Sequence, residues 1–223
     1  MLTKNLFIVD DHPITVHAYK KLILRTKTTT TGIDFETAYS CEEAYNRIIK
    51  KHKDQENLDV ALLDISLPSY PAKNIQTGID VAKLIRHYFP ACKIILLTMH
   101  NEPAIIATAI HGVNPEGFIF KSDIDATSFV TAYQSIMLGD TSYSDTISKV
   151  QNNTTIKKLN FDGTDLQILL LLDKKIKTKN MPHHLDLSIS AIEKRKAAIK
   201  NKLLKDKGSN KEIIEEAKKI GLI

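Results

Sequence analysis

Only 2 of the 223 residues are cysteines, Cys41 and Cys92. Two cysteines are too few for the disulfide framework of a small secreted domain, so we expect two reduced and mostly buried thiols. The chain also lacks an apolar run of about 18 residues, which excludes a membrane-spanning helix. Its first residues, Met-Leu-Thr-Lys-Asn, lead straight into a strand pattern and lack the hydrophobic segment of a signal peptide. These absences together predict a cytoplasmic protein without a membrane partner.

Charged residues are distributed unevenly along the chain. Residues 1–140 contain 14 Lys/Arg and 16 Asp/Glu, a net charge of −2, whereas residues 141–223 contain 17 and 10, a net charge of +7. A chain of 223 residues, of which 43% are hydrophobic, is long enough for one large domain or for two small domains with cores of their own. The charge pattern therefore predicts an acidic first domain and a basic second domain that binds a polyanion.

Short apolar runs alternate with helical patterns up to residue 139. The apolar runs are Leu6–Val9, Val60–Leu63, Ile94–Leu97 and Gly117–Phe120, and Phe35–Tyr39 is a more modest strand pattern. Patterns with helical spacing follow them, near residues 13–25, 41–50, 78–89, 102–111 and 126–138. Five strands alternating with five helices predict an α/β domain, a doubly wound parallel (flavodoxin-like) sheet of five strands with helices on both faces.

Polar side chains stand where four of these strands end. Asp10 and Asp11 follow the first run, Asp64 the third, Thr98 the fourth and Lys121 the fifth. A lone aspartate at a strand end is most simply the N-cap of the next helix. The carboxyl ends of parallel strands meet at one edge of the sheet, however, and ligands bind there. Carboxylates held together at that edge repel one another, and a divalent cation that prefers oxygen ligands, such as Mg²⁺, relieves the repulsion.

Residues beyond 139 show no strand pattern. Residues 140–158 are rich in Ser, Thr and Asn and predict a linker. Helical patterns follow near 163–173, 178–185, 191–205 and 210–220, and the third of these is preceded by a capping sequence at 187–190. Residues 193–207 include seven basic and two acidic residues. A charge run is usually only a solvated face, but a short helix, a tight turn and a longer basic helix are typical of a helix-turn-helix.

Both parts resemble one family, the bacterial two-component response regulators of the NarL/FixJ (LuxR-type) class. Over residues 4–139 the resemblance rests on Asp10-Asp11-His-Pro, Asp64-Ile-Ser-Leu-Pro, Leu97-Thr98-Met-His and Gly117-Phe118-Ile-Phe-Lys121. Over residues 159–223 it rests on Leu159, Ile168-Leu169, Leu185-Asp-Leu-Ser188, Ile192, Lys202-Leu203 and the closing Gly221-Leu-Ile. The resemblance implies a receiver domain at 1–139, a linker at 140–158 and an all-α, four-helix helix-turn-helix domain at 159–223.

For the first domain, the resemblance implies a phosphoacceptor site. Asp64 would take a phosphoryl group from a phosphohistidine of a sensor histidine kinase, a transfer that needs charge stabilisation more than covalent help. Lys121 and Thr98 would contact phosphoryl oxygens. Phe118 would act as a switch aromatic, and it can also serve as an ordinary core residue. Mg²⁺ would be held by three carboxylates and one main-chain carbonyl, those of Asp10, Asp11, Asp64 and Ser66.

For the second domain, the resemblance implies sequence-specific binding to double-stranded DNA. The amino end of the second helix of a helix-turn-helix enters the major groove, and flanking lysines neutralise phosphates. The candidates for DNA contact are Ser188, Ser190, Lys194, Arg195, Lys196, Lys200 and Lys202. Phosphorylation is expected to promote a homodimer that binds paired half-sites and regulates transcription.

The sequence departs from the family pattern in both domains. Residues 69–77 lengthen the loop beside Asp64, Pro182 interrupts the first helix of the turn motif, and Glu193 replaces a DNA-contacting lysine. One alternative is therefore a degenerate helix-turn-helix tail that binds proteins rather than DNA. A second alternative is a Mg²⁺-dependent phosphatase or phosphotransferase with Asp64 as its nucleophile. Ser66 disfavours it, because such enzymes usually have a second acid two residues after the nucleophile.

Overall fold

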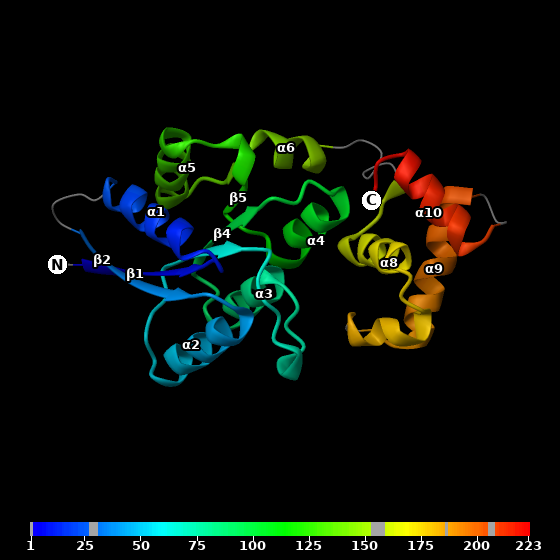
Figure 1. The fold of residues 1–223 in the computed structure, drawn as a ribbon, viewed down its shortest axis with the longest axis horizontal. Coiled ribbons are helices and arrows are strands. Elements are labelled where there is room, and N and C mark those ends of the chain that lie inside the picture. Colours follow the sequence, from blue (N-terminus) through cyan, green and yellow to red (C-terminus); the bar gives the residue numbers. More distant parts are fainter. Residues whose placement is uncertain (1, 27–30, 153–158, 186, 205–207) are drawn as a thin grey trace. The chain divides into compact units, whose positions relative to one another are not determined.

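The structure, a computed structural model, describes residues 2–26, 31–152, 159–185, 187–204 and 208–223 (Figure 1). Its contacts divide the chain into two compact units. The first comprises Met1–Met99 and Val113–Ile147, and the second comprises His100–Gly112 and Ser148–Ile223. Each unit has a hydrophobic cluster of its own.

The first unit is built on a parallel sheet with the strand order β2-β1-β3-β4-β5-β6. The strands are β1 (Leu2–Val9), β2 (Thr31–Ala38), β3 (Val60–Asp64), β4 (Lys93–Thr98), β5 (Gly117–Phe120) and β6 (Ser142–Tyr143). All residues of β3 and nearly all of β4 are buried. This burial accounts for their continuous apolar sequences, because a central parallel strand is covered on both faces.

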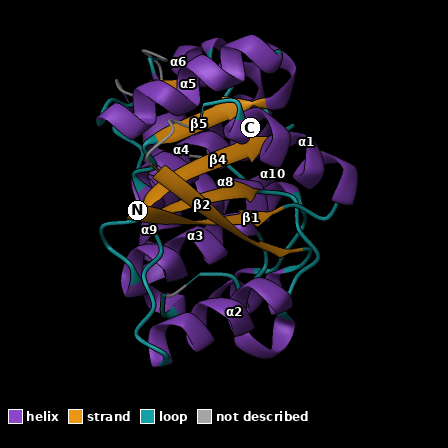
Figure 2. Cartoon of the chain, turned by 90° about the vertical axis from the view of Figure 1, so that its left-hand side faces the viewer, coloured by secondary structure: helices purple, strands orange, loops and turns teal. Residues whose placement is uncertain are grey.

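Helices cover both faces of this sheet (Figure 2). On one face α1 (Pro13–Leu24) packs with α5 (Ala126–Leu138), and on the other α2 (Cys41–Lys53) packs with α3 (Gly78–Tyr88). The N-cap predicted at Ser40 is present, because its side chain accepts the Glu43 N–H at 3.1 Å. The predicted end of α5 is also confirmed, at Gly139 with a φ of 109°.

The sequence prediction missed two parts of the sheet. β2 begins at Thr31 rather than Phe35, because it pairs with β1 at an edge of the sheet, where a continuous apolar run is not needed. β6 lies within the segment predicted as a linker and pairs with β5, so the sheet has six strands rather than five. The helix α6 (Asp145–Gln151) also lies in that segment. Residues 153–158 of the predicted linker, and residue 205 at the predicted end of the basic helix, lie outside the described residues.

The second unit is helical in its described residues. It contains most of α4 (Pro103–Val113) and the C-terminal elements α8 (Gly163–Asp173), η3 (Thr178–His183), α9 (Ile189–Leu204) and α10 (Asn210–Lys219). The segment predicted as a helix at 178–185 is a 3-10 helix with Pro182 inside it, which fits a residue that lacks a backbone N–H and obstructs an α-helix. The predicted fold class, a parallel α/β sheet followed by a helical part, is confirmed. Among the described residues, no helix has both the length and the apolar character needed to cross a membrane.

Candidate functional site

The charged residues predicted at the strand ends meet at one edge of the sheet. Asp10 follows β1, Asp64 ends β3 and Lys121 follows β5. The parallel register pairs Val9 with Leu63, which brings the ends of β1 and β3 side by side. The Lys121 ammonium lies 2.6 Å from Asp64 Oδ2 and 2.9 Å from Asp10 Oδ2. A single cation therefore bridges two carboxylates that lie at the ends of two different strands. The sequence predicted that these groups would meet at this edge, but not that Lys121 would bridge the carboxylates.

Burial affects the pKa values of the charged groups in this cluster. The side chains of Asp10 and Asp64 are 0% and 5% exposed, and that of Lys121 is 19% exposed. Burial raises the pKa of the Asp64 carboxyl group, and the hydrogen bond and charge of Lys121 only partly oppose that rise. Burial alone would lower the pKa of Lys121, but its hydrogen bonds to the two carboxylates outweigh burial and raise the pKa. The lysine is therefore held in its charged form beside a carboxylate that is costly to ionise.

Backbone groups hold the two carboxylates in place. The Ser66 N–H donates to Asp64 Oδ1 at 3.1 Å, and the His12 N–H donates to Asp10 Oδ1 at 2.9 Å. At the start of α3, Gly78 packs so closely that an added Cβ would overlap the carbonyl oxygen of Asp64. The sequence predicts only that a helix begins near residue 78, and this close approach depends on the tertiary fold.

Four side chains at this edge could together hold a metal ion. Asp10, Asp11, His12 and Asp64 each offer one ligand atom, and these atoms all lie within 4.8 Å of one another. Three of the four are the carboxylates predicted from the sequence, and oxygen donors of this kind suit a hard divalent cation. The fourth, His12, was not predicted. Its Nδ1 lies 2.7 Å from Asp11 Oδ1.

The remaining predicted residues of this edge are buried. Thr98 is 0% exposed at the end of β4. Phe118, also 0% exposed, packs edge-to-face against Tyr143 of β6 with the ring centroids 6.3 Å apart. Phe118 is therefore a core aromatic in this structure, which is compatible with either role considered for it.

The lengthened loop after Asp64 folds back on itself. Tyr70 and Ile75 form an antiparallel bridge in which the Tyr70 N–H donates to the Ile75 carbonyl at 2.7 Å. Ile75 is buried, and the Tyr70 ring packs on Tyr45 of α2 with the centroids 5.8 Å apart. The extra residues are thus anchored on α2.

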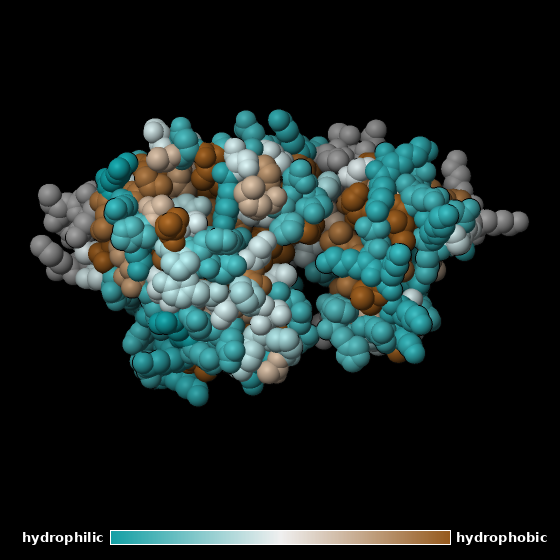
Figure 3. All heavy atoms as spheres, in the orientation of Figure 1, coloured by the Kyte–Doolittle hydropathy of each residue, from teal (hydrophilic) through white to brown (hydrophobic). Residues whose placement is uncertain are grey.

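In the second unit, the residues predicted to contact DNA lie on or next to α9. The Ser188 side chain accepts the Ala191 N–H at 3.2 Å and caps the helix, as its sequence predicted. Ser190 and Lys194 are exposed, and Lys200 is partly buried. Hydrophilic side chains cover much of the α9 surface that faces the viewer in Figure 3.

Three of the predicted DNA-contacting side chains make contacts within the protein. Arg195 Nη1 lies 2.8 Å from a carboxylate oxygen of Asp162 and 2.8 Å from one of Asp165. Lys196 donates to the Thr178 hydroxyl at 2.7 Å. Lys202 donates to the Asn160 carbonyl at 2.9 Å and lies over the Phe161 ring. Sequence reasoning missed these partners because they come from elements far upstream of α9.

The contact with Arg195 also affects the pKa of Asp162, the residue that caps α8. Burial opposes ionisation of Asp162, but a backbone hydrogen bond from Asp165 and the contact with Arg195 outweigh it and lower the pKa of Asp162. Arg195 thus joins α9 to the first turn of α8.

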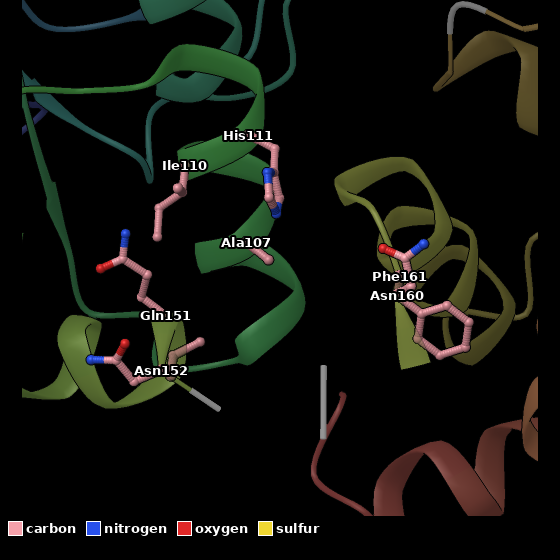
Figure 4. A pocket seen from close by; sticks show the side chains of 8 residues that line it. Ala107, Ile110, His111, Gln151, Asn152, Asn160 and Phe161 are labelled. Carbon is pink, nitrogen blue, oxygen red and sulfur yellow. The ribbon is translucent and has the colours of Figure 1, made fainter. Parts of the chain in front are cut away.

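The second unit contains a pocket whose lining residues differ chemically from those of the acidic sheet edge (Figure 4). It is lined by Ala107, Ile110, His111, Val150, Gln151, Asn152, Asn160 and Phe161. None of these lining residues is a carboxylate or a cysteine, so the pocket offers neither the anionic ligands nor the nucleophile present at the sheet edge.

Residues 6–134 match the family model described as "Response regulator receiver domain". The chain belongs to the response regulator receiver family. The acidic cluster of Asp10, Asp11 and Asp64 is typical of the metal site of response regulator receivers.

Individual relatives extend this likeness. The transcriptional regulatory protein RcsB of Salmonella typhi is 31% identical over 121 residues, which cover 54% of this chain and 50% of RcsB. The oxygen regulatory protein NreC of Staphylococcus carnosus is 26% identical over 228 residues, covering 97% of each chain. A structure of RcsB from Salmonella enterica serovar Typhimurium, bound to promoter rprA with the phosphomimetic BeF3−, matches with a TM-score of 0.64 and 20% identity, covering 96% of this response regulator and 98% of that chain.

These likenesses differ in what they cover. The match to the RcsB sequence spans about half the length of that relative, 50%, and lies on one part of the chain. The matches to NreC and to the RcsB structure extend over nearly the whole chain, and both relatives are regulators of the NarL/FixJ class. They confirm the resemblance read from the two sets of motifs, and the structural match confirms the fold of both parts of this response regulator.

Proposed function

We propose that this protein is a transcription regulator of a two-component system in which Asp64 is the phosphoacceptor. The observation that carries the proposal is the Lys121 ammonium, 2.6 Å from Asp64 and 2.9 Å from Asp10 at the carboxyl edge of the sheet. An ammonium beside a nucleophilic carboxylate can pair with the phosphoryl oxygens that arrive there. The partner is a sensor histidine kinase, and both proteins act in the cytoplasm.

In the proposed reaction, a carboxylate oxygen of Asp64 attacks the phosphorus of a phosphohistidine. An oxygen–phosphorus bond forms, the nitrogen–phosphorus bond breaks, and the electron pair returns to the histidine of the kinase. Lys121 then pairs with a phosphoryl oxygen. Burial, which raises the pKa of Asp64, makes this carboxylate more basic and so a stronger nucleophile once it is ionised.

The residues that would hold Mg²⁺ are Asp10, Asp11 and Asp64, with the main-chain carbonyl of Ser66 as a further ligand. The clustering of three carboxylates supports this assignment. When bound, Mg²⁺ neutralises part of the negative charge of the phosphoryl group and the carboxylates. The protein catalyses only its own phosphorylation and dephosphorylation.

The proposed switch uses two buried residues. Thr98 would move inward to donate a hydrogen bond to the phosphoryl group, and Phe118 would turn into the space that Thr98 leaves. The complete burial of both side chains supports this coupling, because neither can move in a close-packed interior without displacing neighbours. The surface formed by β5 and α5 would change as a result.

We assign the receiver to residues 1–143, so that it includes β6 of its sheet, the linker to 144–158 and the DNA-binding domain to 159–223. The tail would bind double-stranded DNA, and phosphorylation would favour a homodimer that reaches two half-sites. The basic charge of residues 141–223 supports binding to DNA. RcsB, to which this chain is similar, is seen bound to a promoter, and two RcsB dimers are seen bound to two DNAs.

A second candidate is a tail that binds a protein instead of DNA. The observation in its favour is that Arg195, Lys196 and Lys202 are engaged with groups of their own unit. Side chains held in this way neutralise fewer phosphates than the basic sequence suggests.

DNA binding by the full-length protein tests the proposal. The wild type and an Asp64→Asn control would each be treated with acetyl phosphate and Mg²⁺, and each would then be titrated with random-sequence double-stranded DNA over a salt series. We expect phosphorylation to tighten binding only in the wild type, and the affinity to fall steeply with salt. An affinity for DNA that depends on neither salt nor phosphorylation would support the protein-binding tail instead.

A further inference from the structure

One face of α9 is exposed over three turns. Ser190, Glu193, Lys194, Ala197 and Asn201 are all exposed, at spacings of three and four residues. The opposite face is buried, and Ile192 and Ile199 are 0% and 1% exposed. Residues at these spacings share one side of a helix, so the exposed residues form one continuous surface.

Three of the basic residues that flank this surface contact other parts of the protein. Arg195 is paired with Asp162 and Asp165 at the first turn of α8. Lys196 and Lys202 contact Thr178 and Asn160. The exposed face therefore carries one lysine and one glutamate in its amino-terminal half, in place of the basic cluster that the sequence suggested.

We propose that Glu193 and Lys194 read neighbouring bases of the DNA site, and that Glu193 specifies a cytosine. The inference rests on the proposed DNA-binding function. The second helix of a helix-turn-helix contacts base edges with its amino-terminal residues, and Glu193 and Lys194 occupy the second turn of α9. Arg195 is a positioning residue that fixes α9 against α8 and does not touch the bases.

The chemistry of a carboxylate restricts what Glu193 can contact. In the major groove guanine offers two acceptors, and thymine offers an acceptor and a methyl group. Adenine offers an N6 amino donor beside the N7 acceptor, which repels a carboxylate, whereas cytosine offers an N4 amino donor with no acceptor beside it. A phosphate repels a carboxylate, so Glu193 has no favourable partner on the DNA backbone. No ion pair of Glu193 occurs among the described residues, which leaves its carboxylate available to a donor in the groove. Lys194 beside it suits the O6 and N7 acceptors of guanine.

Exchanging the acceptor for an amide makes the inference testable. Glutamine pairs with the N6 and N7 groups of adenine, so Glu193→Gln should change the selected base from cytosine to adenine at one position of the site. We expect a preference of about tenfold to be reversed at that position, and the rest of the motif to stay the same. Glu193 is exposed, so this substitution leaves the core untouched.

The experiment is a selection from a random double-stranded DNA library with full-length protein, phosphorylated by acetyl phosphate and Mg²⁺. Wild type and Glu193→Gln would be compared with Glu215→Gln, a matched loss of one negative charge at an exposed position of α10. Competition titrations would then measure the affinity for the selected site with cytosine or adenine at the affected position. We expect Glu215→Gln to select the wild-type motif.

The outcomes separate this inference from the proposed function. A wild-type motif that Glu193→Gln selects unchanged would overturn the inference while DNA binding stands. A uniform gain in affinity for all sequences in Glu193→Gln would also overturn it, because Glu193 would then only repel phosphates. A wild type that selects no motif and binds without salt dependence would overturn the DNA-binding function itself, and the inference with it.

Discussion

Replacing Lys121 with methionine tests the electrostatics of the acidic edge. Methionine keeps an apolar chain of similar length but removes the ammonium that bridges Asp64 and Asp10. The ligand atoms of the two carboxylates lie within 4.8 Å of each other. With an effective dielectric constant of about 20, two unit charges at that separation repel by about 3.5 kcal/mol. We therefore expect Lys121→Met to lower the free energy of unfolding by about 3 kcal/mol at pH 8.

This loss should depend on pH in a defined direction. Burial already raises the pKa of Asp64, and Lys121 opposes that rise. Without the ammonium the pKa rises further, so the folded protein binds a proton more tightly than the unfolded chain does. Stability then falls as the pH rises from the ordinary carboxyl value through the raised one. The difference in the free energy of unfolding between Lys121→Met and the wild type should therefore be largest at pH 8 and smaller at pH 5.

Urea unfolding followed by circular dichroism, at both pH values and with or without Mg²⁺, measures these effects. A cation present at about 100 times its Kd adds about 2.7 kcal/mol, so Mg²⁺ should restore most of the lost stability. Lys51→Met is the matched control, because Lys51 also bridges two carboxylates, Glu36 at 3.1 Å and Glu56 at 2.8 Å, which are more exposed. It should lose about 1 kcal/mol or less, without recovery in Mg²⁺. A Lys121→Met protein as stable as the wild type at pH 8, or equally weakened at both pH values, would refute the reasoning.

Three further predictions concern other parts of the structure. Gly78→Ala should lower the free energy of unfolding by about 1–3 kcal/mol and slow phosphorylation by acetyl phosphate, because the new methyl group overlaps the Asp64 carbonyl oxygen; unchanged urea unfolding and phosphorylation would contradict the close packing. Arg195→Gln should cost about 1 kcal/mol in urea unfolding at neutral pH. The ordinary pKa of Asp162 is 3.8, and a backbone hydrogen bond and Arg195 lower it in the folded protein despite burial. The cost should therefore disappear as the pH falls below 3.8. A loss of stability that does not depend on pH would contradict the ion pair between Arg195 and Asp162. Burial raises the pKa of Cys41 to about 11, so a thiol reagent at pH 8 should label it only after unfolding, and rapid labelling of the folded protein would contradict its burial.

The central sheet was predictable because its strands are buried on both faces and leave continuous apolar runs, as in Val60–Leu63. The start of β2 was not, since an edge strand tolerates polar residues such as the exposed Asp34. The two residues of β6 carry no pattern of their own, and only their pairing with β5 defines them. Local capping signals were reliable at Ser40 and Ser188, because each cap bond forms within three residues.

The candidate site was also predictable from the sequence only in part. Parallel strands end at a common edge, so the meeting of Asp10, Asp64 and Lys121 followed from where the apolar runs stop. The close approach of Gly78 could not be predicted, because it depends on how α3 packs against the backbone after β3. The contacts of Arg195 with Asp162 and Asp165 could not be predicted either. A helical pattern shows on which face of the helix a residue lies, but not which residue of another helix it contacts.

The intact mass of the full-length protein after treatment with acetyl phosphate and Mg²⁺ tests the central claim most directly. The wild type should gain one phosphoryl group, and so should Asp54→Asn, a control at an exposed position after α2. Asp64→Asn should gain none. An Asp64→Asn protein that is phosphorylated as fully as the wild type, or a wild type that gains no mass, would contradict the assignment of Asp64 as the phosphoacceptor.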